Sequence, residues 1–162
     1  MKIIAIDPGY ERLGVAVLEK LPRQKETLLY STCIQTLKTL PHAERLLKIA
    51  REVRKTIDAF NPKALAIEKL FLSVNQKTAM PVAEARGVIL AEAARAGLAI
   101  YEYTPLQVKV AITGYGKSDK KQVMEMVKKL IALPPGKRLD DEYDAIAIGL
   151  TCLASNSMNH VA

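Results

Sequence analysis

Two acidic residues stand at the ends of short apolar segments that have the pattern of buried β-strands. Asp7 ends the segment KIIAID, and Glu68 ends the segment KALAIE. Because side chains alternate between the two faces of a strand, Asp7 shares a face with Ala5, and Glu68 shares one with Ala66. If the two strands are neighbours, both carboxylates point the same way above a shallow alanine-lined surface. Taken singly, Asp7 could instead be a turn residue before the Pro-Gly pair that follows it, and Glu68 could be a solvated strand end.

A further group of acids opens the segment DDEYDAIAIGLTCLAS. Asp141 and Asp144 are three residues apart, so they share one face if this segment is a helix. Asp140 and Asp141 could also be simple helix N-caps, a position that favours aspartate. The two strand-end acids and this pair together predict that Asp7, Glu68, Asp141 and Asp144 converge at the N-terminal end of the helix.

Four carboxylates at one site require cations, because like charges a few ångströms apart repel strongly. Two hard divalent ions would resolve this conflict. The predicted ligands are all oxygen atoms, without histidine or cysteine, which favours Mg²⁺ or Mn²⁺ over zinc. The residues therefore predict a two-metal site for Mg²⁺, with Mn²⁺ as a possible substitute.

The elements that must position these acids follow from the hydrophobic periodicity. The first three strands are close enough in sequence to form an antiparallel meander, and strands and helices alternate afterwards. We expect strands over Lys2–Asp7, Leu13–Glu19, Thr27–Thr36, Lys63–Glu68 and Leu98–Tyr103, and helices over Pro41–Phe60, Ala79–Ala96, Pro105–Ala111, Ser118–Ile131 and Asp141–Ala154.

This order predicts an α/β fold with a five-stranded mixed sheet covered by helices on both faces. It is compatible with the ribonuclease H-like fold. We expect one domain over residues 1–154, followed by a short, flexible polar tail over residues 155–162.

The composition is that of an ordinary globular protein, with 49% hydrophobic and 25% charged residues among 162. No apolar run approaches the roughly 18 residues of a membrane span, and we see no signal peptide, so we expect a cytoplasmic location with no membrane contact. Cys33 and Cys152 lack metal-type spacing and are interpreted as reduced core residues. The net charge of +7 suggests an anionic partner, nucleic acid first, although many basic proteins bind none.

The motifs around the predicted acids resemble those of a known family. IDPGYERLG, AIEKLF, EARG, QVK, TGYGKSDKKQV and DDEYDAIAIG follow one another in an order and spacing similar to the RuvC family of bacterial Holliday-junction resolvases. The IDPG block alone is weak, because sugar kinases and actin relatives also begin with a strand and an Asp-x-Gly loop. The ordered set is specific, and the resemblance covers nearly the whole chain, from about Lys2 to Leu153.

The resemblance implies a ribonuclease H-like fold and a crossover junction endodeoxyribonuclease. The family's four metal-binding catalytic acids fall on Asp7, Glu68, Asp141 and Asp144, with Asp141 preferred to its neighbour Asp140 by its spacing from the last acid. A homodimer would nick two symmetry-related strands of a four-way DNA junction, leaving 5′-phosphate and 3′-hydroxyl ends, in recombination and repair. The implied partner complex is the RuvA–RuvB branch-migration machinery.

The resemblance also implies the dimer interface and the residues that hold DNA. The helix over Ala79–Ala96 would lie between the protomers, with Pro81 in its first turn. Phe71 would stack on bases opened at the junction, although the pattern alone favours a core residue that continues the strand. Basic residues near the helix expected to be capped by Ser118 and Asp119 would contact phosphate, with the family's lysines matching Lys109 and Lys120. The expected DNA-binding set is Phe71, Lys109, Lys117, Lys120 and Lys121.

Three alternatives can be compared with this function. A nuclease of the YqgF type, implicated in ribosomal RNA maturation, would have the same fold, although the EKLF and QVK blocks and the lysine-rich loop speak against it. A non-catalytic junction-binding protein would not need four acids. An ATP-dependent kinase of the actin-like fold would need about twice the chain. The basic residues of the first helix, between Arg45 and Lys55, are interpreted as a solvated face with at most a general attraction for DNA.

Overall fold

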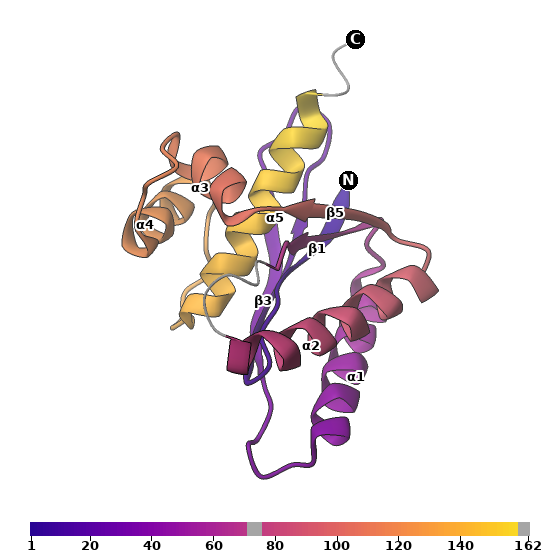
Figure 1. Cartoon of the computed structure of the whole chain (residues 1–162). Coiled ribbons are helices and arrows are strands. Elements are labelled where there is room, and N and C mark those ends of the chain that lie inside the picture. The colour runs from indigo at the N-terminus through magenta and orange to yellow at the C-terminus, as the bar shows by residue number, and fades with distance from the viewer. Residues whose placement is uncertain (71–75, 159–162) are drawn as a thin grey trace.

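The computed structural model describes residues 1–70 and 76–158 of the chain, and it confirms the predicted α/β fold (Figure 1). One five-stranded sheet has the strand order β3-β2-β1-β4-β5. Each observed strand begins and ends within one residue of its expected bounds. The strands are β1 (Lys2–Asp7), β2 (Arg12–Glu19), β3 (Thr27–Gln35), β4 (Ala64–Glu68) and β5 (Ala99–Tyr103).

Five helices accompany the sheet in the described part of the chain. The first helix ends where the Asn-Pro pair predicts, because Asn61 adopts the left-handed conformation and its N–H bonds to the carbonyl of Ile57. The helices are α1 (His42–Phe60), α2 (Gln76–Arg95), α3 (Pro105–Thr113), α4 (Lys120–Leu130) and α5 (Asp140–Met158).

The sheet is antiparallel in its first half and parallel in its second. β1, β2 and β3 form the predicted meander, because their connections are short. β4 pairs parallel to β1, and β5 pairs parallel to β4, and α1 and α2 supply the crossovers that parallel pairs require. This mixed topology is the ribonuclease H-like arrangement that was expected.

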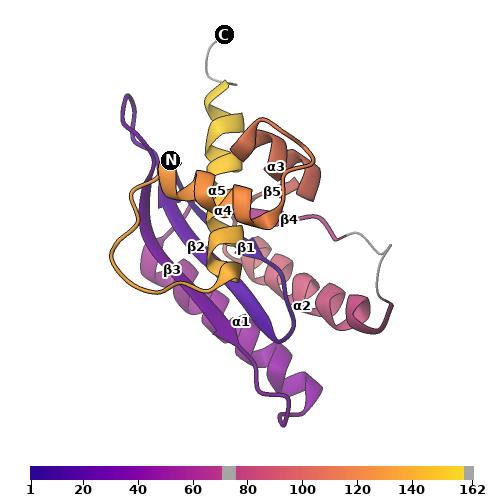
Figure 2. The ribbon, with the colours of Figure 1, turned by 90° about the vertical axis from the view of Figure 1, so that its left-hand side faces the viewer.

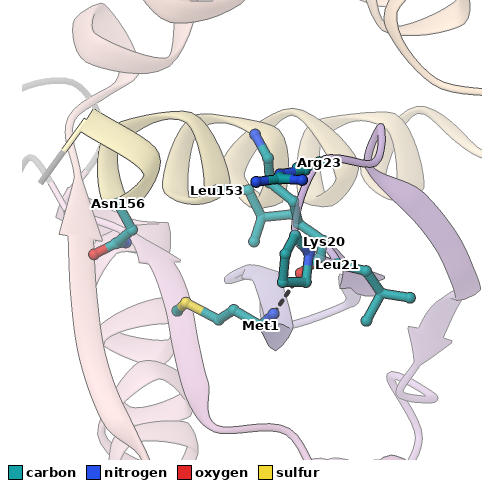
Figure 3. Close-up of a pocket in the computed structure, with 7 residues that line it drawn as sticks. Met1, Lys20, Leu21, Arg23, Leu153 and Asn156 are labelled. Carbon is teal, nitrogen blue, oxygen red and sulfur yellow. Dashed lines mark hydrogen bonds between the residues drawn. The ribbon is translucent and has the colours of Figure 1, made fainter. Parts of the chain in front are cut away.

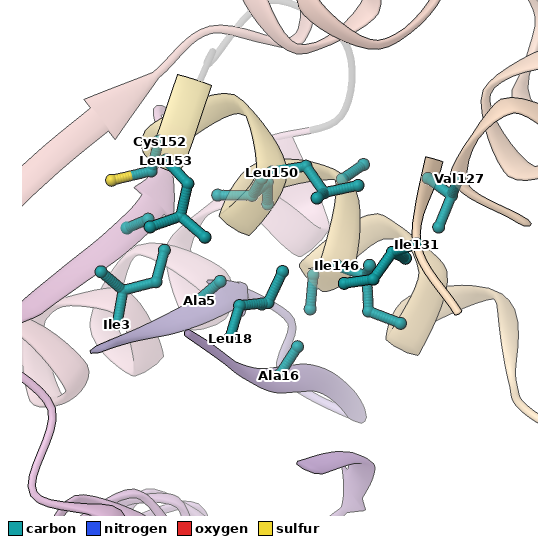
Figure 4. Packing of buried hydrophobic residues seen from close by; sticks show 14 of the residues in the cluster. Ile3, Ala5, Ala16, Leu18, Val127, Ile131, Ile146, Leu150, Cys152 and Leu153 are labelled. Carbon is teal, nitrogen blue, oxygen red and sulfur yellow. The ribbon is translucent and has the colours of Figure 1, made fainter. Parts of the chain in front are cut away.

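The two faces of the sheet carry two separate hydrophobic cores. Strand alternation sends Ile3 and Ala5 of β1 toward α3, α4 and α5, where they join a cluster that Figure 4 shows at close range. Ile4 and Ile6 face the opposite way and pack with residues of α1 and α2. Figures 1 and 2 show the same layers, with α5 crossing one face and the α1–α2 pair covering the other. β1 is therefore buried on both sides, which explains its unbroken apolar run.

Small residues allow α5 to lie close to the sheet. Ala5 and Ala16 are completely buried beneath it. A Cβ atom on Gly14 of β2 would stand 1.8 Å from the carbonyl oxygen of Asp141, and one on Gly149 would stand 2.5 Å from a Leu18 methyl group. The backbone at the start of α5, which carries the predicted acids, therefore lies directly against the backbone of β2 at Gly14.

Two helix boundaries differ from expectation by three residues or more, and the other helix ends agree within two residues. α2 begins at Gln76 rather than Ala79, so Pro81 lies inside the helix and not in its first turn. Pro81 lacks the N–H that would donate to the carbonyl of residue 77, so the first turns of α2 are held by one hydrogen bond fewer. α5 continues to Met158, beyond Ala154, into the segment expected to be a tail. No helix in the described ranges is both long and apolar enough for a membrane crossing.

Candidate active site

The strand-end acids lie side by side, as the alternation predicts. β1 and β4 are parallel neighbours, with Ala5 opposite Ala66 and Ile6 opposite Ile67. Asp7 and Glu68 are the next residues of the two strands, at the same edge of the sheet. The condition on which the sequence argument depended, that the two strands are neighbours, is confirmed.

The N-terminal half of α5 brings a third acid to this edge. A cavity of about 230 Å³ is lined by the carboxylates of Asp7, Glu68 and Asp144. Lys109 of α3 and Lys120 of α4 line the same cavity, so three acids and two lysines from five elements meet there. The remaining lining residues are Pro105, Val108, Val123 and Ala147.

Asp141, the fourth predicted acid, does not line this cavity. Its Oδ2 is 2.9 Å from Nη2 of Arg12, at the start of β2. The Sγ of Cys33 donates to the same oxygen at 3.9 Å. The sequence reasoning missed Arg12, and its only signal there was a charged residue next to the Pro-Gly turn that follows Asp7.

Lys120 pairs with the acids of α5. Its Nζ is 2.9 Å from Oδ2 of Asp144 and 3.8 Å from Oδ2 of Asp140. Asp140 therefore points to the lysine, and neither it nor Asp141 lies among the residues that line the cavity. The doubled aspartate at the start of α5 is divided between two cations, Lys120 and Arg12.

Crowding of acids in this cavity disfavours their ionised forms. Burial raises the pKa of Asp7 well above its ordinary value, and the charges of the other three acids raise it further, that of Asp144 most. Burial and the charge of Asp144 raise the pKa of Glu68 to about 7, against an opposing effect of Lys109. Burial also raises the pKa of Asp144, although Lys120 lowers it.

The acidic side chains of this site are chemically suited to bind a hard divalent cation. They are carboxylate oxygens in a cleft where negative charge is under-compensated, the setting in which Mg²⁺ and Mn²⁺ are held. Across residues 1–70 and 76–158, however, no three histidine, cysteine, aspartate or glutamate side chains are already arranged around one metal position. Asp144 and Asp141 are engaged with Lys120 and Arg12, so both side chains would have to exchange these partners for a metal.

The residues expected to bind DNA do not all lie at the acid cavity. Lys109 and Lys120 line the cavity, whereas Lys117 and Lys121 are exposed outside it. Phe71 lies outside the described residues.

The N-terminal cap of α4 differs from expectation in one residue. Asp119 caps α4 in a capping box with Gln122. Ser118, expected to share this role, is buried, and its hydroxyl lies 2.6 Å from Oγ1 of Thr113. The N-terminus of α4 is therefore already satisfied by an acidic side chain, which weakens the argument for a phosphate at that position.

The interpretation of Arg45 as part of a solvated face is wrong. The side chain is buried, and its guanidinium lies 3.7 Å from the centre of the Tyr10 ring. Its Nε donates to the hydroxyl of Thr36 at 2.9 Å. The aromatic ring and the hydroxyl allow the cation to be buried, so Arg45 joins α1 to the turn that follows Asp7.

A larger cavity, of about 470 Å³, lies at the other end of α5 (Figure 3). None of the residues that line it carries a carboxylate, and the N-terminal amine beside it donates to the backbone carbonyl of Lys20. It therefore has no part in the acid cluster. Its lining residues are Met1, Lys20, Leu21, Pro22, Arg23, Leu153 and Asn156.

Comparisons with known proteins match this architecture to one family. The family model "Crossover junction endodeoxyribonuclease RuvC" matches residues 3–152. A crossover junction endodeoxyribonuclease RuvC from Thermosipho melanesiensis is 49% identical over 154 residues, which are 95% of this chain and 97% of that protein.

Solved structures agree with the sequence relatives. The structure of Thermus thermophilus RuvC has a TM-score of 0.88 at 34% identity, covering 98% of this chain and 97% of that one. T. thermophilus RuvC in complex with a Holliday junction substrate has a TM-score of 0.90 at 33% identity, covering 98% and 96%. A yeast mitochondrial Holliday junction resolvase, with a TM-score of 0.69 at 13% identity, shares the fold.

Proposed function

The chain belongs to the RuvC family, and from this premise we propose that it is a crossover junction endodeoxyribonuclease that resolves Holliday junctions. The observation that carries the proposal is the meeting of Asp7, Glu68 and Asp144 with Lys109 and Lys120 around one cavity. Acids that bind divalent cations and lysines that bind phosphate are the two components that phosphodiester hydrolysis needs. The solved complex of a relative with a Holliday junction substrate supports a four-way DNA junction as the substrate.

We assign the metal-binding and catalytic role to Asp7, Glu68, Asp141 and Asp144. Asp7 is the central ligand, because it stands between the acid of β4 and those of α5, whose charges all act on it. Glu68 and Asp144 complete the cavity. Asp141 joins them after its carboxylate leaves Arg12, whose side chain is half exposed and can be solvated when it is released.

The proposed cofactor is Mg²⁺, two ions per site, with Mn²⁺ as a substitute. When bound, the ions supply the positive charge that activates a water nucleophile and stabilises the leaving 3′ oxygen. The acids hold and orient that charge, and the apolar side chains of Val108 and Val123 limit the access of other water to the cavity. The products would carry 5′-phosphate and 3′-hydroxyl ends.

Lysines provide the contacts to the DNA backbone in this proposal. Lys120, which pairs with Asp144 in this structure, would contact the scissile phosphate, and Lys109, which lines the same cavity and acts on the charge of Glu68, would be a second phosphate contact. The exposed Lys117 and Lys121 extend the basic surface along α4. Phe71, in the segment after β4, stacks on an opened base.

The family implies an assembly around this site. We infer a homodimer in which α2 lies between the protomers, so that two sites nick two symmetry-related strands. The RuvA–RuvB branch-migration complex is the inferred partner, and the cytoplasm is the inferred location. The family match favours this DNA activity over RNA processing by a YqgF-type nuclease, and the retained acids disfavour a junction-binding protein without activity.

The deciding experiment incubates the protein with a synthetic mobile four-way junction, a linear duplex and an RNA hairpin, with Mg²⁺ or with EDTA. We expect symmetric cuts in the junction only, and only with Mg²⁺. Asp7→Asn should lose at least about 100-fold in cleavage rate while metal-free junction binding persists, because the change removes one ligand charge and keeps the side-chain volume. Cleavage of the RNA hairpin in preference to the junction, or full activity of Asp7→Asn, would refute the assignment.

A further inference from the structure

The EARG motif occupies residues 84–87 within α2, away from the lining of the acid cavity. One of its side chains, Arg86, nevertheless reaches the end of β4 at Glu68, and Glu84 is linked through His42 to the turn after β1. Between them, Ala85 is completely buried against the sheet, as is Ile89 one turn later. The helix backbone at the motif is therefore held firmly by the core.

Arg86 bridges the ends of β4 and β5. Its Nε donates to the backbone carbonyl of Glu68 at 3.2 Å. Its Nη2 forms an ion pair with the carboxylate of Glu102, which lies on β5 next to Ile67 of β4. Only 17% of the arginine side chain is exposed, compared with 40% of its partner. One rigid guanidinium thus joins a helix to two strands at the point where the chain leaves β4.

We propose that Arg86 is a positioning residue that sets the orientation of Glu68 for metal binding. This inference deepens the proposed nuclease function and rests on it. Glu68 is the last residue of β4. The peptide that follows it is held on its N–H side by the sheet, because the N–H of Lys69 donates to the carbonyl of Tyr103 on β5 at 2.8 Å. A hydrogen bond from a charged donor to its carbonyl fixes that peptide, and charge-assisted hydrogen bonds are stronger than neutral ones. Arg86 thus restrains the carbonyl side of the same peptide, directly after the Cα atom that carries the Glu68 side chain.

Glu84, the other charged residue of the motif, is linked to the end of β1 through two further side chains. The Oε2 of Glu84 is 2.8 Å from Nε2 of His42, and Nδ1 of that ring is 2.6 Å from the hydroxyl of Tyr10. Tyr10 belongs to the turn directly after β1, which ends at Asp7. This second connection is weaker than the first, because about half of the Glu84 and His42 side chains is exposed. The motif therefore links α2 to both strand ends, mainly through Arg86.

A merely structural ion pair elsewhere on α2 provides the matched control. Glu92 is buried and pairs with Arg54 of α1 at 2.9 Å, so Glu92→Gln also removes an ion pair between α2 and another element. It lies far from the acid cavity and does not line it. If Arg86 only stabilised the fold, neither Arg86→Ala nor Glu92→Gln would change kcat or Mn²⁺ affinity below its own unfolding temperature.

The test compares Arg86→Ala, Arg86→Lys and Glu92→Gln with the wild type, below the unfolding temperature of each. We expect Arg86→Ala to lower kcat on a four-way junction by about 10- to 100-fold, the usual effect of losing a group that orients a metal ligand. Metal-free junction affinity should stay within about threefold. Arg86→Lys should recover part of the rate, because it keeps the charge beside Glu102 but not the planar donor. Glu92→Gln should keep the wild-type kcat.

Direct titration with Mn²⁺, followed by its paramagnetic resonance signal without DNA, provides a readout independent of activity. Arg86→Ala should weaken Mn²⁺ binding by about 10-fold, whereas Glu92→Gln should not. Unchanged Mn²⁺ affinity and unchanged kcat in Arg86→Ala, or equal losses in Glu92→Gln, would overturn the positioning role. A wild type that does not cut the junction would refute the proposed function instead, and the Mn²⁺ titration would then decide the role of Arg86 alone.

Discussion

Glu68→Gln is expected to stabilise the metal-free protein at pH 8. The carboxyl of Glu68 has its pKa raised from 4.5 to about 7 by burial and by the charge of Asp144. An acid whose pKa is higher in the folded state than in the unfolded state favours folding while it is protonated. This contribution is fully present below about pH 4.5, declines as the pH rises, and is lost above about pH 7. Glutamine has the same shape and never ionises, so it avoids the loss.

The magnitude follows from the two pKa values. The interval from 4.5 to about 7 corresponds to about 3.4 kcal/mol, at about 1.36 kcal/mol for each pH unit. The side chain of Glu68 is only half-buried, so solvent screens its charge, and we expect about 2 kcal/mol at pH 8. For a chain of 162 residues this corresponds to a rise of about 4–8 °C in Tm. At pH 5 the gain should fall below about 1 kcal/mol, because the folded wild type is then protonated at this site.

The assay is thermal unfolding, followed by circular dichroism in EDTA at pH 8 and at pH 5. Glu44→Gln is the control, because Glu44 is exposed in the first turn of α1, far from the other acids, and its loss should change the free energy of unfolding by less than about 1 kcal/mol. A second scan with Mg²⁺ should stabilise the wild type more than the Glu68→Gln variant. A Tm of Glu68→Gln at or below that of the wild type at pH 8, or a gain that is the same at both pH values, would refute the crowding of charge at this site.

Two further changes test the positions of the site's neighbours. Gly14→Ala should lower the free energy of unfolding by about 3 kcal/mol, because its Cβ would stand 1.8 Å from a backbone oxygen of Asp141. The control Gly87→Ala has open space around the new Cβ and should be neutral or slightly stabilising. Equal Tm values for the two variants would contradict the close approach of α5 to β2. Arg12→Ala should increase the Mn²⁺ affinity of the DNA-free protein several-fold, because it releases Asp141 and removes a competing cation. The free energy of unfolding should change by less than about 1 kcal/mol. A weaker Mn²⁺ affinity would show that Arg12 assists the acids and does not compete with metal.

The sequence predicted the strand-end part of the site because that part depends on local rules. Alternation along a strand decides which face Asp7 shares, and the parallel pairing of β1 with β4 brings Glu68 to the same edge. The helical spacing of Asp141 and Asp144 is equally local. The fold class followed from the same periodicities, and all five strand positions are within one residue of expectation.

The partners of the charged residues were not predictable, because they depend on contacts between distant segments. Arg12 meets Asp141 only because Gly14 allows α5 to approach β2. Arg45 has the charge pattern of a solvated helix face, yet the ring of Tyr10 and the hydroxyl of Thr36 allow it to be buried. The early start of α2 was missed because Pro81 favours a first-turn position when only the sequence is considered.

The division of the acids between the first strand and the last helix has a consequence for biosynthesis. A chain emerging from the ribosome presents Asp7 early, but Asp144 comes from the element that is made last among those described. Until α5 is present, the sheet face around Ala5 and Ala16 lacks its cover, so that face stays open to chaperones and proteases. Completion of the hydrophobic core and completion of the set of acids are then one event.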